Sequence, residues 1–476
     1  MRPLVWMRTD LRTHDNPALH HACKASSRGV VAVFTICPKQ WLSHDMAPIK
    51  AAFILRNLKD LSETLAKKNI ALKIIETPTF ATVPKLLKKL ANEHECDALY
   101  FNREYEVNEQ ERDEEVTKVF ESAGISIHAF TDQCVFAPGE VLTGKGDPYT
   151  VFTPFKKSWC AAVDEDRDRI ELLSAPRKLA EMVSTPDDIP ASIKGFSIAD
   201  PREDLWHAGE KHAISRLNAF IENRLRSYKD ARDVPAINGT STISPYLASG
   251  VVSLRTCVHA AVQANNGKLD TGNIGATTWI SELVWREFYK HILFHFPRVC
   301  KHRAFKVETE RLRWNDNNEH FAAWCEGRTG FPIVDAAMRQ LVQTGWMHNR
   351  LRMIVAMFLS KNLFLDWRLG ERFFMRHLID GDLAPNNGGW QWSASTGTDA
   401  APYFRIFNTV TQSKKFDPDG SFIRKFVPEL KDVDNDAIHD PSTLPELARA
   451  NLDYPQPIVD LKQTRERAIE AFRELK

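Results

Sequence analysis

The sequence predicts an α/β parallel-sheet domain at the N-terminus, a long linker and an all-α domain at the C-terminus. Short apolar runs alternate with helical patterns over the first 130 residues, whereas helical periodicity alone is found from about residue 206 onward. The length of 476 residues is also too great for one core, because single cores stop growing near about 250–300 residues. We therefore expect domains at 1–130 and 206–476, joined by a linker at 131–205.

Five apolar runs in the first domain are typical of buried strands. The expected strands are 3–7, 29–37, 71–76, 98–101 and 126–130, and the helices expected between them are 47–68, 81–95 and 108–123. Strands with little polar alternation suit a parallel sheet that is covered on both faces. The domain has no GxGxxG or GxxxxGK motif, so it is not an ordinary dinucleotide-binding or P-loop module. A ligand would still bind beyond the carboxyl ends of the strands, at 8–10, 37–38 or 102–109.

The segment 131–205 is rich in Pro, Gly and Asp, and we expect it to be an irregular connection over the surface. In the second domain, hydrophobic periodicity predicts helices at 209–226, 253–265, 277–295, 332–344, 348–363 and 369–378. No strand, internal repeat or low-complexity tract is evident in that half of the sequence.

The composition indicates an ordinary globular protein of the cytoplasm. Hydrophobic residues make up 43% and charged residues 26%, which excludes a disordered chain, a collagen and a coiled-coil rod, and the formal net charge is +1. The eight cysteines form no CxxC pair and no cluster with zinc spacing, so we expect reduced thiols and no metal site. The start MRPLVWMRTDLR is not a signal peptide, and no apolar run of about 18 residues predicts a membrane span.

Tryptophan and positive charge are both concentrated in the second domain. Eight of the 12 tryptophans lie between Trp279 and Trp392, where they could be core residues, a stacking site for flat rings or a relay of redox-active indoles. Between Arg286 and Arg376 there are 16 Lys and Arg against 9 Asp and Glu. This surplus fits contact with nucleic-acid phosphates or, equally, a set of solvated helix faces.

Three segments of the second domain carry unusual combinations of residues. The first would place Trp279, Glu282 and Arg286 on one face of a helix. Glu282 and Arg286 could form a simple i,i+4 ion pair, worth a few tenths of a kcal/mol. A carboxylate among tryptophans is costly, however, unless it has a polar ligand or partner.

The second segment carries Asn349, Arg352 and Met353 on one helix face. The third, 380–392, contains two Asp, two Asn and three Gly before its second Trp, which is poor material for a core. We expect an irregular loop with a function there, in which Asp380 could neutralise Arg352 and the glycines allow a ligand close to the backbone.

At these residues the sequence resembles the photolyase/cryptochrome family, and within it the class I cyclobutane pyrimidine dimer DNA photolyases. The segment IDGDLAPNNGGWQWSASTGTDAAPYFRIFN is highly specific to that family. The resemblance runs over nearly the whole chain, from LVWMRTDLRTHDN near the start to LDYPQPIVD near the end. It implies an α/β antenna domain, a linker and a helical domain that binds FAD.

The family holds a U-shaped FAD without a Rossmann motif, which agrees with the missing GxGxxG. By motif position, the resemblance implies these flavin-holding residues: Tyr228, Thr240, Ser241, Thr242, Ser244, Trp279, Glu282, Asn349, Arg352, Asp380, Asp382 and Asn386. Hydroxyl groups at 240–244 suit a pyrophosphate, which takes many donors. Arg352 and Asp380 would lie beside the flavin ring.

The resemblance also implies the reaction, in which an electron from light-excited reduced FAD opens a cyclobutane pyrimidine dimer that has flipped out of DNA. The protein would then be a carbon–carbon lyase with the catalytic residues Glu282, Asn386, Trp285, Trp392, Asn349 and Met353. The family places Asn386 near flavin N5, and Asn is typical of photolyases there, whereas plant-type cryptochromes usually carry Asp and animal-type ones Cys. The sequence at 348–353 lacks the paired His of (6-4) photolyases, which favours cyclobutane dimers.

Three further sets of residues follow from the resemblance. The DNA-binding residues would be Arg232, Trp285, Arg286, Asn349, Arg350, Arg405 and Gln412. The electron relay to the flavin would be Trp390, Trp367 and Trp314, which core packing could equally explain. An antenna, 5,10-methenyltetrahydrofolate rather than a deazaflavin, would bind at His44, Asn108, Glu109, Cys300 and Lys301, although Glu109 also suits the first turn of a helix.

The sequence departs from the family pattern at Thr409, where Asn-Pro usually follows the RIF sequence. A cryptochrome-like blue-light photoreceptor is the alternative function, but it would usually need a C-terminal extension beyond the helical core. A non-catalytic flavoprotein is a third possibility, disfavoured by Glu282, Trp285 and Trp392. We expect a monomer that acts on DNA containing pyrimidine dimers and has no membrane partner.

Overall fold

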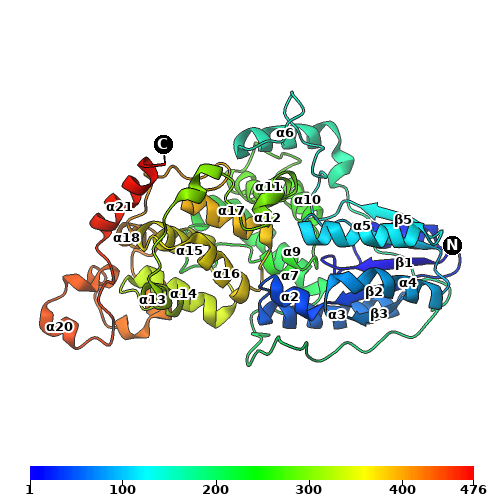
Figure 1. Ribbon diagram of the computed structural model, residues 1–476, viewed down its shortest axis with the longest axis horizontal. Coiled ribbons are helices and arrows are strands. Elements are labelled where there is room, and N and C mark those ends of the chain that lie inside the picture. The colour runs from blue at the N-terminus through cyan, green and yellow to red at the C-terminus, as the bar shows by residue number, and fades with distance from the viewer. Residues whose placement is uncertain (476) are drawn as a thin grey trace. The chain divides into compact units, whose positions relative to one another are not determined.

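The computed structural model describes residues 1–475, which form two compact units (Figure 1). Unit 1 comprises residues 1–226, 241–297 and 379–382, and unit 2 comprises 227–240, 298–378 and the chain from 383 onward. The parallel sheet lies in unit 1 and unit 2 is helical, which confirms the predicted fold class. The boundaries at residues 131 and 206 stay a prediction, since the units group the chain by packing rather than by the kind of element.

The sheet of unit 1 consists of five parallel strands in the order β3-β2-β1-β4-β5. The strands are β1 (Pro3–Met7), β2 (Val31–Ile36), β3 (Ala71–Glu76), β4 (Ala98–Asn102) and β5 (Ser126–Phe130). Every residue of the central strand β1 is buried, and Leu4 pairs with Val31 on one side and Leu99 on the other. All five predicted strands are confirmed, because continuous apolar runs are what a doubly covered sheet requires.

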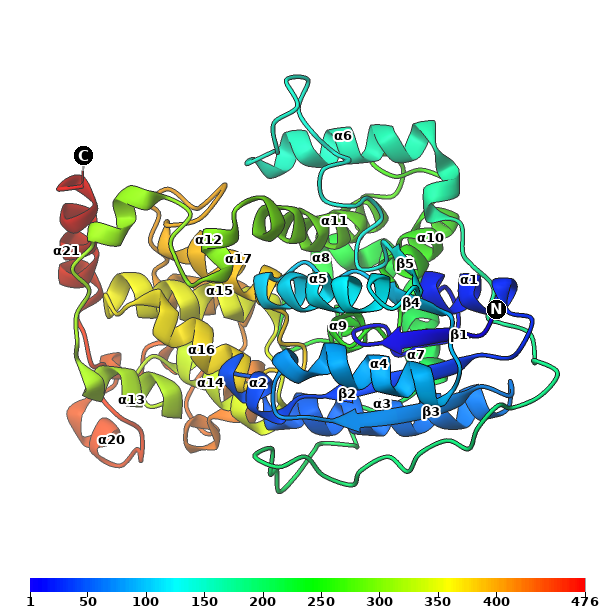
Figure 2. The ribbon, with the colours of Figure 1, turned by 45° about the vertical axis from the view of Figure 1, so that its right-hand side comes forward.

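Helices cover both faces of this sheet. They are α1 (Pro17–Ala25), α2 (Pro38–Ser43), α3 (Pro48–Ala66), α4 (Val83–Glu93) and α5 (Val107–Glu121). Right-handed crossovers put α1 and α3 on one face and α4 and α5 on the other, where α4 and α5 lie side by side (Figure 2). The start of α1 is encoded locally, because the Asn16 side chain accepts a hydrogen bond from the Leu19 N–H and Pro17 opens the helix.

The carboxyl ends of β1 and β4 are occupied by the protein's own buried ions. Arg12 pairs with Asp132, and Arg255 contacts both Asp132 and Asp15. Close by, Glu104 accepts a hydrogen bond from Arg112 at 2.7 Å. Burial opposes ionisation of Glu104, yet Arg8 and Arg112 hold its pKa at about 2. Ion pairs that include Arg12 and Glu104 therefore close the ends of β1 and β4.

The predicted linker contains a helix that the sequence analysis did not find. Residues 131–205 were expected to be irregular, but α6 spans Phe152–Glu165. Its buried side chains Phe152, Phe155 and Trp159 follow helical spacing and pack against α11 (Ile274–His295). The Pro, Gly and Asp residues that suggested a loop flank this helix rather than fill it. The prediction was wrong here because turn residues on either side hid one apolar stripe.

The chain from 171 to 209 is irregular, as predicted, and it runs along the edge strand β3. The Asp187 N–H donates to the Leu72 carbonyl at 2.9 Å, and the Ile74 N–H donates to the Asp187 carboxylate at 2.9 Å. Lys73 also pairs with Asp187. The segment thus satisfies backbone groups that an exposed edge strand would leave open to other chains.

The other helices follow the predicted pattern closely. The predicted helices at 209–226, 253–265, 277–295, 332–344 and 369–378 correspond to α7 (Glu210–Asn223), α10 (Leu254–Ala264), α11, α14 (Pro332–Thr344) and α16 (Trp367–His377). Short helices α8 (Tyr228–Ala231), α9 (Ser244–Ala248), α12 (Pro297–Cys300), α13 (Asn318–Glu326) and α19 (Ser421–Phe426) lie between them or follow them, as do α15 (Asn349–Met357), α17 (Leu383–Ala394), α18 (Thr409–Phe416), α20 (Glu446–Ala450) and α21 (Leu461–Arg473). Within residues 1–475, no helix combines the length and apolar character needed to cross a membrane.

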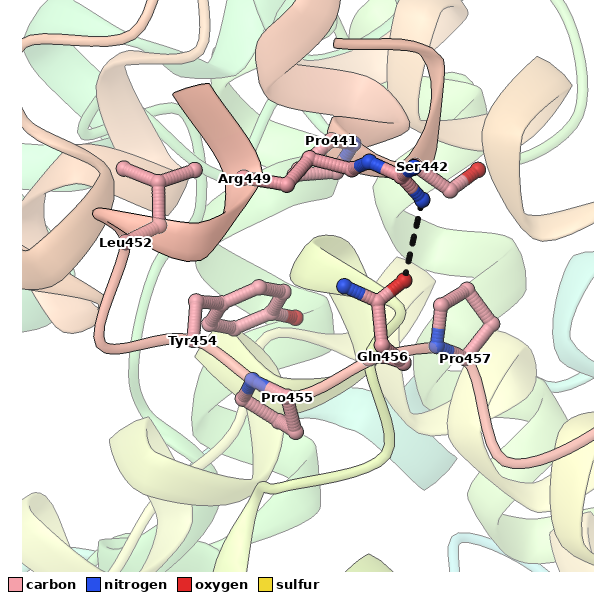
Figure 3. A pocket seen from close by; sticks show the side chains of 9 residues that line it. Pro441, Ser442, Arg449, Leu452, Tyr454, Pro455, Gln456 and Pro457 are labelled. Atoms are coloured by element: carbon pink, nitrogen blue, oxygen red, sulfur yellow. Dashed lines mark hydrogen bonds between the residues drawn. The ribbon is translucent and has the colours of Figure 1, made fainter. Parts of the chain in front are cut away.

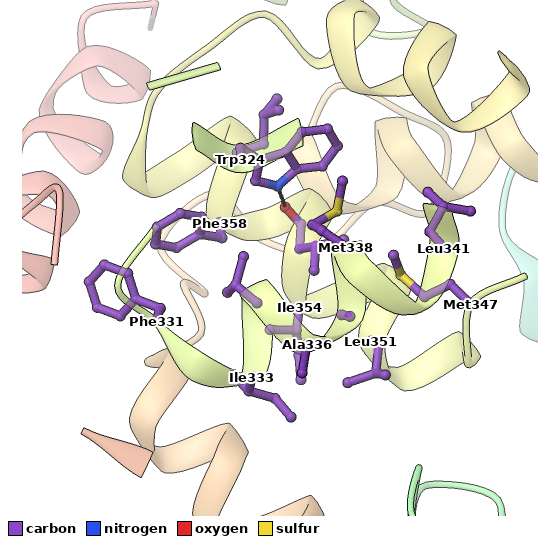
Figure 4. Close-up of a cluster of buried hydrophobic side chains, with 14 of the residues drawn as sticks. Trp324, Phe331, Ile333, Ala336, Met338, Leu341, Met347, Leu351, Ile354 and Phe358 are labelled. Carbon is purple, nitrogen blue, oxygen red and sulfur yellow. Dashed lines mark hydrogen bonds between the residues drawn. The ribbon is translucent and has the colours of Figure 1, made fainter. Parts of the chain in front are cut away.

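The core of unit 2 is assembled around Trp324, which is fully buried (Figure 4). Side chains from α13, α14 and α15 surround its indole, among them Met338 and Ile354. The indole N–H donates to the Val355 carbonyl at 3.2 Å, so the polar atom of this large side chain is satisfied inside the core.

The predicted helix at 348–363 is interrupted by a π-helical turn at Phe358–Asn362. Lys361 of this turn is fully buried, donates to the Ser395 hydroxyl at 2.8 Å and lies 3.9 Å from the centre of the Phe472 ring of α21. Burial, with repulsion from Lys306, lowers the pKa of Lys361 to about 7. The turn therefore contains a lysine whose charge opposes folding at neutral pH.

A K361M variant tests this cost through the pH dependence of stability. The unfolded chain keeps the lysine proton up to the ordinary pKa of 10.5, whereas the folded protein releases it near 7. Between these values the unfolded state binds more protons, so the free energy of unfolding of the wild type rises with pH by roughly 1 kcal/mol per unit. Denaturant melts from pH 7 to 10 should show the advantage of K361M over wild type shrinking by that slope. An exposed control, K414M, should follow the wild type, and a pH-independent K361M difference would contradict the assignment.

Candidate functional site

Helix α11 confirms the spacing predicted for the first unusual segment. Trp279 is buried and packs against Phe220 of α7, with ring centroids 4.9 Å apart. Glu282 and Trp285 are half-buried on the same helix. Arg286 forms an ion pair with Asp382 at 3.3 Å, so its partner lies outside the helix. The helix therefore presents a carboxylate and an indole ring at a partly covered surface.

Glu287 is a structural residue of α11 that the sequence analysis missed. Its carboxylate is fully buried and accepts hydrogen bonds from the N–H groups of Val135 and Phe136, at 2.7 and 3.0 Å, and from the indole of Trp159 at 2.8 Å. Burial raises the pKa of Glu287 to about 7, although these three donors counteract it. A buried acid that ties α6 and the chain at 135–136 to α11 left no distinctive pattern in the sequence.

Asp382 fixes the residues of the third segment that belong to unit 1. Its carboxylate lies 2.8 Å from the Lys290 ammonium and 3.3 Å from the Arg286 guanidinium. Burial opposes the charge, but these two cations hold the pKa of Asp382 at about 2. Two hydrogen bonds hold the neighbouring residues. Lys50 donates to the Gly381 carbonyl at 2.5 Å, and the Ser244 hydroxyl donates to Asp380 at 2.6 Å.

The hydroxyl groups predicted to hold a pyrophosphate lie in the chain that leads into α9. Thr242 adopts a left-handed conformation with φ of 48°. Its hydroxyl accepts a hydrogen bond from Arg216 at 2.6 Å and donates to the Ser241 carbonyl at 2.8 Å. Ser241, Thr242 and Ser244 belong to unit 1, whereas Tyr228 and Thr240 belong to unit 2. A run of hydroxyls beside a guanidinium is a donor set that fits a phosphate group.

Helix α15 confirms the face predicted for the second segment. Asn349 is exposed at its start, and Arg352 and Met353 are half-buried one turn later. The Arg352 guanidinium donates to the Met347 carbonyl at 2.8 Å. Arg350 instead pairs with Asp233 at 2.9 Å, next to Arg232.

The third segment is a helix rather than the irregular loop that was predicted. Helix α17 contains Asn386, Trp390 and Trp392 despite its two glycines. Tertiary contacts override its weak propensity, because the side chain of Asn387 donates to the buried carboxylate of Glu371 at 2.7 Å and Asn386 donates to the Glu371 carbonyl at 3.1 Å. The prediction was wrong because these partners on α16 are invisible in the local sequence.

The three predicted relay tryptophans differ in burial. Trp390 and Trp367 are 2% and 1% exposed, whereas Trp314 is half-buried and packs on Phe364. Trp390 lies against Gly370, where an added Cβ would come within 2.1 Å of the indole, so only glycine fits. The Trp390 indole N–H is buried and has no acceptor within residues 1–475. A buried donor of this kind is available to an acceptor on a bound group.

Three of the five predicted antenna residues lie together at the end of α2 and the start of α5. The Nε2 atom of His44 lies 2.8 Å from the Asn108 amide and 2.9 Å from the Gln40 amide, and its Nδ1 lies 3.5 Å from Glu109. Two amide donors require Nε2 to be the acceptor, so the proton belongs on Nδ1, facing Glu109. Burial, with the charge of Glu106, raises the pKa of Glu109 to about 8.

The other two predicted antenna residues, Cys300 and Lys301, belong to unit 2 at the end of α12. Cys300 is half-buried and Lys301 is exposed. The two groups of antenna residues thus come from different units.

The family-atypical Thr409 is the first residue of α18. The Asn408 side chain caps this helix by accepting from the Thr411 N–H at 2.9 Å, so the helix starts where a proline would also start it. Gln412 lies half-buried in the first turn of α18, and Arg405 is exposed in the turn before it. Thr409 therefore gives α18 an ordinary start, with Gln412 in its first turn.

A small pocket in unit 2 lies elsewhere and contains none of the predicted site residues (Figure 3). It is lined by Gly330, Pro441, Ser442, Arg449, Leu452, Tyr454, Pro455, Gln456 and Pro457. Among the residues that the structure describes, no group of three or more His, Cys, Asp or Glu side chains is arranged to hold a metal ion.

Comparison with known proteins places this arrangement in a family. Residues 3–176 match the family model described as DNA photolyase, and residues 279–474 match the FAD binding domain of DNA photolyase. Over 473 residues the chain is 46% identical to the deoxyribodipyrimidine photo-lyase of Escherichia coli, with 98% of each chain covered. It is 40% identical to the Neurospora crassa enzyme of the same name, covering 98% of this chain and 81% of that one.

Solved structures give the same result. A class III photolyase from Agrobacterium tumefaciens has a TM-score of 0.88 and 34% identity, with 100% of this chain and 97% of that one covered. A cryptochrome from Synechocystis has a TM-score of 0.87 and 28% identity, with 98% and 99% covered. The chain belongs to the DNA photolyase family, a class of two-part flavoproteins.

Proposed function

We propose that the protein is a light-driven deoxyribodipyrimidine photo-lyase, which uses reduced FAD to split cyclobutane pyrimidine dimers in DNA. The observation that carries this proposal is α11, which presents Glu282 and Trp285 one turn apart beyond the buried Trp279. A carboxylate and a flat indole on adjacent turns are the groups needed to hold and hydrogen-bond a damaged base. Curated relatives with this activity in their names match the chain over its full length, which supports the same substrate.

The residues present fit FAD. The hydroxyls of Ser241 and Thr242, with Arg216 behind them, suit its pyrophosphate, and the buried indole N–H of Trp390 is open to an acceptor. We assign the remaining predicted residues to the same group: Tyr228, Thr240, Ser244, Trp279, Asn349, Arg352, Asp380, Asp382 and Asn386. When bound, reduced FAD supplies a photo-excited electron that leaves the dimer again after two carbon–carbon bonds break, so there is no net redox change.

Protein side chains must hold the dimer outside the duplex, because the damaged bases are inaccessible while stacked. Flipping the target out of the stack is the established solution for photolyases. We assign Trp285 and Trp392 to aromatic contact with the dimer. Glu282 hydrogen-bonds the base edge, while Asn349 and Met353 line the same site.

Contacts to the DNA backbone are assigned to Arg232, Arg286, Arg350, Arg405 and Gln412. Arg405 is exposed, and it is the clearest phosphate ligand of this set. Arg350 and Arg286 are already paired with Asp233 and Asp382, so their first role is to support the site. Binding through phosphates should fall steeply as salt increases.

We assign Trp390, Trp367 and Trp314 to an electron relay that reduces the resting cofactor. The burial of Trp390 and Trp367 and the partial exposure of Trp314 support a route from the interior to the surface. We assign 5,10-methenyltetrahydrofolate as the antenna, supported by the hydrogen bond between His44 and Asn108 and by Glu109, 3.5 Å from His44. Cys300 and Lys301 complete the proposed antenna site.

We further propose that the enzyme acts as a monomer in the cytoplasm. The eight free cysteines suit a reducing compartment. A blue-light photoreceptor is the second candidate, favoured by the likeness to the Synechocystis cryptochrome. The two functions differ in one measurable property, namely repair of dimers.

Repair of a thymine-dimer oligonucleotide under blue light tests the proposed function, with restored thymines as the readout. The reduced, FAD-loaded wild type should repair the dimer, and E282A should repair about tenfold less at equal flavin content because a hydrogen bond to a charged group is lost. E282Q should fall between them. Full flavin content without any repair would contradict the lyase and favour the photoreceptor. Repair by E282A equal to that of the wild type would contradict a catalytic role for Glu282.

The relay is tested by separating cofactor reduction from repair. In W314F, illumination with an external reductant should no longer reduce the oxidised flavin, because phenylalanine is not oxidised at the potential of an indole. Chemically reduced W314F should still repair dimers. W346F, which alters a tryptophan outside the relay, is the matched control, and unimpaired photoreduction of W314F would contradict the assignment.

The antenna site is tested by adding 5,10-methenyltetrahydrofolate to the FAD-loaded protein and measuring retained folate after gel filtration. E109A should lower retention by about tenfold, since it removes a largely buried hydrogen-bonding group. E114A, an exposed position on the same helix, should bind like the wild type. Equal retention by E109A and E114A would exclude this site.

A further inference from the structure

The indole of Trp285 is stacked on the ring of Phe152, the first residue of α6. The two ring centroids lie 3.7 Å apart and the planes are inclined by 8°. Phe288 and Tyr289 also contact the indole, but their planes are inclined to it by 79° and 33°. Phe152 is thus the ring that covers one flat face of Trp285.

Phe152 is itself held firmly, because α6 is fastened to α11 along its length. The Lys156 ammonium donates to the Ser281 hydroxyl at 2.7 Å, and the Trp159 indole donates to Glu287 at 2.8 Å. Phe155 packs against Phe288 with centroids 5.2 Å apart. The Phe152 side chain is 8% exposed, so its ring has little freedom to move.

This arrangement fixes the plane of Trp285 before any ligand arrives. Trp285 remains half-buried, so part of its indole stays exposed although Phe152 covers one of its faces. An indole that rotated freely would lose conformational entropy when it bound a ligand, and this loss would weaken the affinity. Stacking on Phe152 removes that cost in advance, as preorganised aromatic contacts do.

We infer that Phe152 is a positioning residue for dimer recognition: it sets the plane of Trp285 so that a flipped pyrimidine dimer stacks on the opposite face. The inference rests on the proposed function, because it takes Trp285 as the residue that contacts the dimer. Phe152 acts through Trp285 and does not touch the substrate. Its effect should therefore be found in discrimination between damaged and undamaged DNA, and in KM more than in kcat.

The test measures dark binding of the FAD-loaded protein to an oligonucleotide with one thymine dimer and to the same oligonucleotide without it. F152L and F152M keep the apolar bulk and remove the flat ring, so the ratio of the two affinities should fall about 2- to 10-fold. F152Y keeps the flat ring and should keep the wild-type ratio. V163A shortens a buried side chain near the far end of the same helix and should lower thermal stability without changing the ratio. In a W285A background, F152L should have no further effect, because the two act as one unit.

Each other outcome contradicts the inference. It fails if F152L and F152M keep the wild-type ratio, if V163A lowers the ratio as much as they do, or if W285A itself keeps the ratio. A wild type that neither prefers nor repairs dimer DNA overturns the proposed function together with this inference. A wild type that repairs dimers while F152L keeps the ratio overturns the inference alone.

Discussion

The carboxylate of Asp382 is the constraint on which the arrangement of the site depends. It lies between the ammonium of Lys290 and the guanidinium of Arg286, and Lys290 also pairs with Glu106 at 2.9 Å. The chain belongs to unit 1 for only four residues at this point, 379–382, and to unit 2 on either side. Such a short segment has little apolar surface to bury. The buried side chain of Ile379 and the polar bonds of the segment hold it in unit 1, and Asp382 makes the ion pairs among them.

Helix α11 distributes these bonds around its circumference. Arg286 and Lys290 hold Asp382, Glu287 holds the chain at 135–136 and the indole of Trp159, and Trp285 stacks on α6. A helix that is bonded on several sides can carry half-buried functional groups without moving when a ligand binds. Glu282 and Trp285 therefore lie on a helix that is held by buried charges, and the loss of one partner would leave the other charge unpaired.

Sequence reasoning recovered the elements whose signal is local. The five strands were predicted because buried parallel strands are continuous apolar runs, and hydrophobic periodicity predicted α14 over its full length. In the structure a proline starts this helix and a glycine follows it. Helices α6 and α17 were missed, since both contain or adjoin residues that favour turns. Helix α17 forms because Glu371, 15 residues earlier, accepts from the side chains of Asn386 and Asn387. No window of the sequence contains that pairing.

For the proposed site, the motifs name the residues but do not give their hydrogen bonds and ion pairs. His44 and Asn108 are 64 residues apart, and their contact at 2.8 Å follows from the sheet topology, which places α2 and the start of α5 at neighbouring strand ends. Glu287 and Lys361 were not noticed, because a single buried charge looks like any surface residue in a sequence. The stacking of Phe152 on Trp285 was equally hidden, as it needs α6 to exist.

The basic surplus between Arg286 and Arg376 shows how composition can mislead about a surface. One interpretation of this surplus was a phosphate-binding face, yet the Lys290 side chain is only 3% exposed and Lys361 is fully buried. Arg286 pairs with Asp382 and Lys290 pairs with Glu106, and both acids lie outside the counted range. Lys361 lies against an aromatic ring. Much of the local excess is thus neutralised inside the fold, whereas Arg405, which lies outside the surplus, is exposed. Net charge along a chain predicts an interface only when the acids that fold back onto it are known, and these are set by tertiary structure.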